Sequence, residues 1–130
     1  MTASKNKKAF VTGGSRGIGK GVVRMLTEAG YDVYFTYNTK LDEAKVLQEE
    51  LRQAGHTSFI YQASMGLDGV PEDVTKRAIE DMGGIDLLVC NAGLTRHNTL
   101  LSMNQSQLDF IYNLNYRSYM LCAGIAANHM

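Results

Sequence analysis

The stretch Val11-Thr12-Gly13-Gly14-Ser15-Arg16-Gly17-Ile18-Gly19 decides the fold of this chain. It continues a short apolar segment, residues 9–11, and runs into a helical pattern of apolar side chains at positions 18, 22, 23 and 26. In this strand–turn–helix setting, glycines let the backbone come close to a phosphate, and the helix that follows directs unpaired amides toward it. The stretch therefore predicts a loop that holds the pyrophosphate of a dinucleotide. A tight turn without a ligand is the alternative interpretation.

The composition bounds the class of protein. A chain of 130 residues that is 45% hydrophobic and 20% charged predicts one globular domain. Its 13 basic and 13 acidic residues cancel, so no net field favours nucleic acid or an anionic membrane as a partner. No apolar run has the length of a membrane span, and none precedes the first strand as a secretory signal would. Cys90 and Cys122 have no metal-ligand spacing, so we expect no metal site and a cytoplasmic protein with reduced thiols.

Strand and helix patterns alternate along the whole chain. Strands are expected over residues 8–12, 31–37, 58–62 and 85–90, and helices over 17–29, 41–54, 71–82 and 105–127. Strands separated by helices predict right-handed βαβ units. The expected fold class is α/β, a Rossmann-type three-layer α/β/α domain over residues 1–130 whose parallel sheet has about four strands in the order 3-2-1-4. The run 85–90 is almost continuously apolar, as in a strand that is buried on both faces.

The end of the second strand predicts which dinucleotide binds. In folds of this class an acidic residue about 20 positions beyond the glycines binds the ribose 2′-hydroxyl and repels a 2′-phosphate. This chain has Tyr37, Asn38, Thr39 and Lys40 there, with Asp42 as the first acid, and Arg16 lies in the glycine loop. Charge complementarity favours NADP(H) over NAD(H) as the cofactor. The alternative is that Arg16 and Lys40 are solvated surface charges.

Thr39 is also the expected cap of the second helix, three residues before Asp42.

A second group of small residues, Asn91-Ala92-Gly93, follows the fourth expected strand. Ligands of open parallel sheets bind outside the carboxyl ends of the strands, at the point where the strand order reverses. Small side chains at this point would let the cofactor approach, and the Asn91 amide could fix the backbone or contact a ribose. Taken alone, these residues predict only a turn.

Together the two motifs resemble the short-chain dehydrogenase/reductase family. The pattern Thr12-Gly13-x-x-x-Gly17-x-Gly19, followed by Asn91-Ala92-Gly93, is specific for that family. Residues 14–19 and 91–103 are similar to the corresponding segments of β-ketoacyl-[acyl-carrier-protein] reductases. The resemblance covers nearly the whole chain, but only the amino-terminal half of a family member.

The resemblance implies roles for individual residues. It implies cofactor-phosphate contacts for the loop residues Gly13, Ser15, Arg16, Gly17, Ile18 and Gly19, and places Asn91 near the nicotinamide ribose. After the third strand, where the family has an aspartate that meets the adenine amino group, this chain has Ser64-Met65. A serine hydroxyl can still bind adenine, but the charge-assisted part of that hydrogen bond is lost.

In the last expected helix the resemblance implies a catalytic asparagine that closes a proton relay. The segment Leu108-Asp109-Phe110-Ile111-Tyr112-Asn113-Leu114-Asn115 puts this residue at Asn115, with Asn113 as the competing candidate. Either residue could also be an ordinary polar position on an exposed face.

The family's chemistry requires a tyrosine whose pKa is lowered by a lysine four residues later, together with a serine that orients the carbonyl. None of the seven tyrosines here has a lysine at that spacing. We therefore expect an amino-terminal part, cut before the fifth strand and the Tyr-x-x-x-Lys segment, that does not reduce ketones alone. The whole protein would be an NADP(H)-dependent oxidoreductase acting on a carbonyl or secondary alcohol, with a 3-oxoacyl thioester of fatty acid biosynthesis as the first expectation.

The alternative function is a non-catalytic module that binds nucleotide or assembles. In either case we expect self-association into a homo-oligomer, because the edge strand and the last helix would expose apolar surface.

Overall fold

The computed structural model describes residues 5–94 and 99–130, which form a parallel sheet between two layers of helices. The strands are β1 (Lys8–Thr12), β2 (Asp32–Tyr37), β3 (Ser58–Gln62) and β4 (Leu87–Cys90). Their order is β3-β2-β1-β4 and every pairing is parallel, so the predicted fold class and strand order are confirmed. Residues 95–98, which belong to the family-like segment 91–103, lie outside the described residues.

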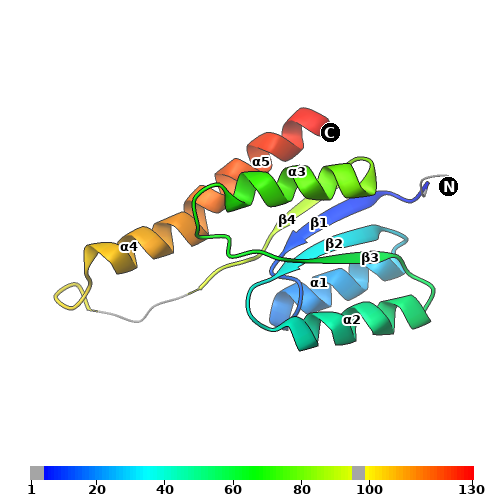
Figure 1. Cartoon of the computed structure of the whole chain (residues 1–130), viewed down its shortest axis with the longest axis horizontal. Coiled ribbons are helices and arrows are strands. Elements are labelled where there is room, and N and C mark those ends of the chain that lie inside the picture. Colours follow the sequence, from blue (N-terminus) through cyan, green and yellow to red (C-terminus); the bar gives the residue numbers. More distant parts are fainter. Residues whose placement is uncertain (1–4, 95–98) are drawn as a thin grey trace.

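Helices cover both faces of the sheet (Figure 1). Helices α1 (Gly17–Glu28) and α2 (Leu41–Gln53) lie on one face, and α3 (Val70–Met82) and α5 (Ser118–His129) on the other. Helix α4 (Gln105–Tyr112) extends away from the sheet. This arrangement leaves the carboxyl ends of the strands open toward α4, where a ligand of a parallel sheet binds.

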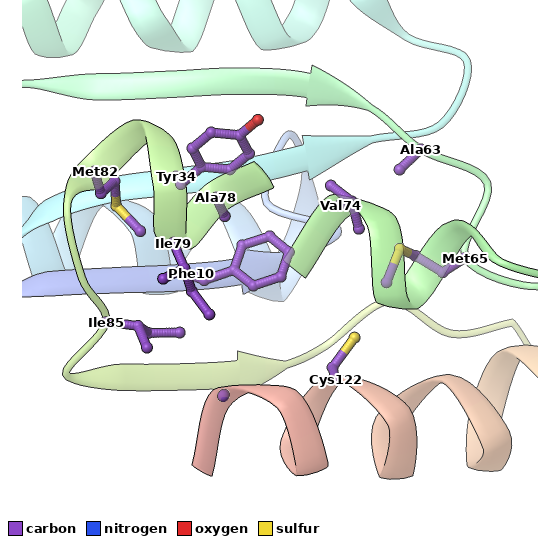
Figure 2. Packing of buried hydrophobic residues seen from close by; sticks show 11 residues of the cluster. Phe10, Tyr34, Ala63, Met65, Val74, Ala78, Ile79, Met82, Ile85 and Cys122 are labelled. Carbon is purple, nitrogen blue, oxygen red and sulfur yellow. The ribbon is translucent and has the colours of Figure 1, made fainter. Parts of the chain in front are cut away.

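The alternation of side chains along β1 builds two cores. Ala9 and Val11 face α1 and α2, where they pack with Val23 and Leu47. Phe10 faces the other way and meets Tyr34 edge to face, with ring centroids 5.8 Å apart. Figure 2 shows this second core, which α3 and α5 close over the sheet and which includes Met65 and Cys122. All five residues of β1 are buried, as expected for a central strand covered on both faces.

Strand β4 differs from the expectation. It begins at Leu87 rather than at residue 85, and all its residues are half-buried rather than buried on both faces. Just before the strand, the carboxylate of Asp86 accepts a hydrogen bond of 2.7 Å from the Lys8 backbone N–H, and the Asp86 N–H donates to the Lys8 carbonyl oxygen at 2.8 Å. Among the described residues β4 pairs only with β1, so its other edge has no strand beside it.

The helical run expected over residues 105–127 is confirmed, but it is not α-helical throughout. Between α4 and α5 lies a π-helical turn, η1 (Asn113–Arg117). A π-turn inserts one residue into the helical repeat, so it shifts the faces that precede and follow it. The helical period of 3.6 residues in the sequence does not reveal this inserted residue, because apolar side chains continue at helical spacing on both sides of it.

The expected cap of α2 is also wrong. Lys40, not Thr39, is the first flanking residue of this helix, and no side chain caps it. The glycines that follow α1 and α2 do have the left-handed backbone that ends a helix, with φ of 97° at Gly30 and 85° at Gly55.

Candidate functional site

A cleft of about 410 Å³ lies at the carboxyl ends of the four strands, where it is bordered by α4 and η1. Its volume is in the range of small-molecule sites. It is lined by the glycine loop, by the ends of β2 and β3, and by the segment after β4. The lining residues are Gly13, Ser15, Arg16, Gly17, Thr36, Tyr37, Asn38, Thr39, Lys40, Ala63, Ser64, Met65, Asn91, Ala92, Gly93, Leu94, Phe110 and Leu114.

The glycine loop has a backbone that most residues could not adopt. Gly13 has φ of 70° and Gly17 has φ of 61°, both in the left-handed region. No side chain caps the first turn of α1 at Arg16, so its amides are open to a ligand at the positive end of the helix dipole. A Cβ on Gly17 would meet no atom within 4 Å, so the loop leaves free space there. These features suit a bound phosphate.

Gly14 and Gly19 are needed for packing beneath the loop rather than for their dihedral angles. A Cβ on Gly19 would lie 2.0 Å from the Gly13 carbonyl oxygen and 2.5 Å from the amide nitrogen of Asn91. A Cβ on Gly14 would lie 2.6 Å from the Cβ of Phe35. The start of α1 can therefore pack against the loop only if both positions have no side chain.

Side chains from β1, from β2 and from the segment after β4 hold the loop in place. The Asn91 amide donates to the Gly13 carbonyl oxygen at 2.9 Å, so this side chain fixes the backbone. The Thr36 hydroxyl accepts from the Gly13 N–H at 2.9 Å. The Thr12 hydroxyl accepts from the backbone N–H groups of Asn91 and Ala92, each at 3.0 Å. The loop after β1 and the loop after β4 are thereby linked before any ligand binds.

The charge of the cleft is positive at one end. Among the residues that the structure describes, Arg16 and Lys40, both exposed, are the charged residues of the lining, and none of the lining residues is an aspartate or glutamate. The segment between β2 and α2, which contains Lys40, is held by the Gln62 amide, which donates to the Asn38 carbonyl oxygen at 3.0 Å. An anion is therefore favoured beside the end of β2.

The end of the cleft beside β3 is mainly apolar. Met65 is buried, and Phe110 of α4 and Leu114 of η1 line the same cleft. A Cβ on Gly66 would lie 3.5 Å from the Phe110 ring and 3.6 Å from the Cβ of Leu114, so these side chains pack close to the segment after β3. Ser64 contributes the hydroxyl at this end.

Asn115 lies in the π-turn and binds the backbone after β4 with both amide atoms. Its Oδ1 accepts from the Leu94 N–H at 3.0 Å, and its Nδ2 donates to the Leu94 carbonyl oxygen at 2.8 Å. Asn115 is half-buried, and both of these hydrogen bonds are open to solvent. The side chain of Asn113 makes no hydrogen bond within residues 5–94 and 99–130. Asn115 is not part of the cleft lining, and its catalytic role stays a prediction.

Most residues predicted to bind the cofactor line one cleft, including all those at the ends of β2, β3 and β4. Ile18 and Gly19 are outside the lining: Ile18 is 81% exposed, and Gly19 is buried beneath the loop. Sequence reasoning assigned no role to the hydroxyls of Thr12 and Thr36, although both lie at the ends of expected strands. It also missed Phe110 and Leu114, which no motif marks.

Two titratable groups close to the segment after β4 are shifted by burial. Burial raises the pKa of the Cys90 thiol to about 11, and Cys122 adds to the shift. A Cβ on Gly93 would lie 3.7 Å from the Tyr119 hydroxyl, whose pKa is raised by burial and by Cys90. A tyrosine with a raised pKa is a weaker proton donor than a free one.

Within residues 5–94 and 99–130, no three side chains of histidine, cysteine, aspartate or glutamate gather where they could hold a metal ion. In the same part of the chain, no helix has the length and apolar character needed to cross a membrane.

Comparison with known proteins relates this geometry to one family. A family model described as short chain dehydrogenase matches residues 7–130. The 3-oxoacyl-[acyl-carrier-protein] reductase FabG of Staphylococcus epidermidis is 35% identical over 117 residues, which are 90% of this chain and 48% of that protein. The chain therefore spans about half the length of the curated relatives that it matches.

Two solved structures with bound cofactor are also similar. A short chain dehydrogenase from Burkholderia cenocepacia in complex with NADP has a TM-score of 0.91 and 32% identity, over 95% of this chain and 51% of that one. A blue fluorescent protein from a metagenomic library, in complex with NADPH, has a TM-score of 0.92 and 33% identity over the same shares.

Proposed function

The chain belongs to the short-chain dehydrogenase family, and from this premise we propose that it is the cofactor-binding part of an NADP(H)-dependent oxidoreductase. The observation that carries the proposal is the cleft: its described lining residues include an open glycine loop, two cations and no carboxylate. The bound nicotinamide would supply the hydride. The chain's own residues would bind and orient the dinucleotide.

Each part of the cleft has a separate task in this proposal. The loop Gly13–Gly17 and the first turn of α1 hold the pyrophosphate. Arg16 and Lys40 attract a 2′-phosphate beside the end of β2, where NAD(H) would present only a hydroxyl. Asn91, whose amide is engaged by Gly13, keeps the loop in position beside the nicotinamide half. The complexes with NADP and NADPH among similar structures support the same choice of cofactor.

Titration with NADPH and NADH, followed by nicotinamide fluorescence, tests this proposal. We expect NADPH to bind at least about tenfold more tightly than NADH, which corresponds to about 1.4 kcal/mol. Lys40→Ala should reduce this ratio, because it removes a cation of the cleft. Lys45→Ala is the matched control, since Lys45 is an exposed lysine of α2 outside the cleft lining. Equal affinities for both dinucleotides, or a ratio that Lys40→Ala leaves unchanged, would contradict the choice of NADP(H).

For the whole protein we propose a carbonyl substrate, with a 3-oxoacyl thioester as the first choice. The similarity to FabG reductases supports this class. None of the seven tyrosines in the chain has a lysine four residues later, so the 130 residues alone should not oxidise NADPH with such a substrate. Oxidation of NADPH by the chain alone that occurs only when the thioester is present would contradict this expectation.

The lack of a lysine four residues after any tyrosine of the chain also favours a second candidate, a non-catalytic module that binds the nucleotide. The reading frame beyond codon 130 separates the two functions. A frame that continues into a serine and a Tyr-x-x-x-Lys segment supports the oxidoreductase, and a stop codon supports the module.

We also propose that the protein is a cytoplasmic homo-oligomer. The free thiols of Cys90 and Cys122 suit a reducing compartment. Leu108, Tyr112, Tyr116 and Met120 recur every four residues from α4 to α5 and are each more than half exposed. This row, here called the α4–α5 stripe, is apolar surface that a second copy of the chain could cover.

A further inference from the structure

We infer that Ser118, which is outside the described lining of the cleft, is a positioning residue for the wall of the cleft after β4. It acts through Asn115 on Gly93 and Leu94, which do line the cleft. The inference rests on the proposed function for the identity of the ligand. Its structural step can be tested without any ligand.

Ser118 lies where the π-turn η1 meets α5, and it is only 1% exposed. After this residue, α5 closes the core shown in Figure 2. Before the turn, α4 extends past the strand ends (Figure 1). A buried side chain at this junction can therefore influence how the two helices are joined.

The π-turn changes the partners of two carbonyl groups. In an α-helix the Ser118 N–H would donate to the carbonyl oxygen four residues earlier, which is that of Leu114. Here it donates to the Asn113 carbonyl oxygen, five residues earlier. The Leu114 carbonyl accepts a hydrogen bond of 2.6 Å from the Ser118 hydroxyl instead. One serine thus supplies donors to both carbonyl groups.

The bond from the hydroxyl favours the π-turn over a continuous α-helix. Without the hydroxyl, the Leu114 carbonyl would regain a donor only if the N–H of residue 118 returned to it, which removes the inserted residue. Successive residues of an α-helix are about 100° apart around its axis, so this change would rotate α4 relative to α5 by about that angle. Asn115, which lies within the turn, would then no longer face the segment after β4.

Asn115 transmits the geometry of the turn to the cleft. Its amide binds the N–H and the carbonyl oxygen of Leu94, at 3.0 and 2.8 Å. A Cβ on Gly93 would lie 3.0 Å from the Asn115 Oδ1, so this side chain packs closely against the segment. In the proposed complex the adenosine half lies toward β2, and the segment after β4 borders the nicotinamide half. A change in the turn therefore reaches the nicotinamide half of the ligand.

The first test compares two ligands by calorimetric titration. NADPH has both halves of the dinucleotide, whereas adenosine 2′,5′-bisphosphate has no nicotinamide half. Ser118→Ala should weaken the binding of NADPH by about fivefold, the effect of one hydrogen bond, and leave the affinity for the bisphosphate unchanged. In an Asn115→Ala background, Ser118→Ala should have no further effect on either affinity, because the two residues act in series.

Thr27→Val is the matched control. Thr27 is also a buried residue of a helix, and its hydroxyl donates to the carbonyl oxygens of Val23 and Arg24 at 3.1 and 2.9 Å. It lies in α1, which is α-helical over its whole length, and outside the described lining of the cleft. Loss of this hydroxyl can lower the stability of the fold, but it should not change the ratio of the two dissociation constants.

Amide hydrogen exchange, measured by NMR, tests the structural step without a ligand. Ser118→Ala should accelerate the exchange of the Leu94 N–H, which donates to Asn115, by about fivefold or more. The Ala92 N–H is the internal control, because it donates to the Thr12 hydroxyl and should exchange at an unchanged rate.

Either measurement can overturn the inference. An unchanged affinity for NADPH in Ser118→Ala, or an equal weakening of both ligands, would show that Ser118 does not position the nicotinamide side of the cleft. An unchanged exchange rate at Leu94 would show that the turn does not depend on the hydroxyl. If the wild-type chain binds neither ligand, the proposed function fails, and the exchange at Leu94 alone decides whether Ser118 positions this segment.

Discussion

Asn91 and Gly13 are 78 positions apart in the chain and are joined by a hydrogen bond of 2.9 Å from the asparagine amide to the glycine carbonyl oxygen. This bond connects the segment after β4 to the loop after β1. The glycine loop is therefore held by side chains of the neighbouring strands as well as by its own dihedral angles.

Replacement of Asn91 should affect the loop more than the rest of the fold. Asn91→Ala leaves the Gly13 carbonyl without its partner, which costs about 1–3 kcal/mol when the group is buried from water. We expect the affinity for NADPH to fall by about tenfold or more, with circular dichroism unchanged. Calorimetric titration measures the affinity, and chemical denaturation measures the stability. Unchanged affinity would show that the loop does not depend on this bond.

Two glycines of α1 should respond in opposite directions to alanine. A Cβ on Gly19 would lie 2.0 Å from the Gly13 carbonyl oxygen, whereas a Cβ on Gly21 would meet no atom within 4 Å. Gly19→Ala should therefore destabilise the protein and abolish the binding of NADPH. Gly21→Ala should stabilise it by about 0.5–1 kcal/mol, because alanine loses less backbone entropy in a helix. Thermal denaturation of the pair tests the difference, and equal midpoints would contradict it.

The two asparagines of the π-turn should also differ. Asn115→Ala removes two hydrogen bonds to the backbone of Leu94 and should lower the free energy of unfolding by about 1–2 kcal/mol. Asn113→Ala should change it by less than about 0.5 kcal/mol, since that side chain makes no hydrogen bond within residues 5–94 and 99–130. Urea denaturation of the two variants makes the comparison. A larger loss for Asn113→Ala would show that the assignment is reversed.

The reactivity of the cysteines should depend on pH in a defined direction. Burial raises the pKa of the Cys90 thiol to about 11, so the folded state favours the protonated form. The resulting stability is full below the pKa of an unfolded cysteine, near about 8.5, and is lost as the pH rises toward the folded value. Alkylation of the folded chain by iodoacetamide should be slow at neutral pH and accelerate above it. Mass spectrometry follows the reaction, with the denatured chain as control; equal rates at neutral pH would contradict the shift.

Exposure of the α4–α5 stripe predicts self-association at tens of micromolar. The rings of Tyr112 and Tyr116 are stacked with centroids 5.3 Å apart, so they form one apolar surface. Tyr116→Lys combined with Met120→Lys should shift the chain toward the monomer in sedimentation. The control is Met25→Lys, which places a lysine on α1, where the side chain is 72% exposed. A wild-type monomer at these concentrations would refute the assembly.

Much of the fold could be predicted from local patterns. The glycines at 13 and 17 indicated a turn that only glycine adopts readily, and the spacing of apolar residues indicated alternating strands and helices. The right-handed crossover of βαβ units then leaves few possible strand orders. For these reasons the order 3-2-1-4 and the position of the glycine loop followed from the amino-acid sequence.

Other features depended on contacts between distant segments. The π-turn has no signal in the periodicity, yet it directs Asn115 to Leu94. The half-burial of β4 reflects its place at the edge of the sheet, not the apolar character of its residues. Phe110 and Leu114 reach the cleft because α4 extends past the strand ends, and a helical pattern does not say what lies opposite its faces. Local sequence thus specified the glycine loop, and long-range packing specified the surfaces that surround it.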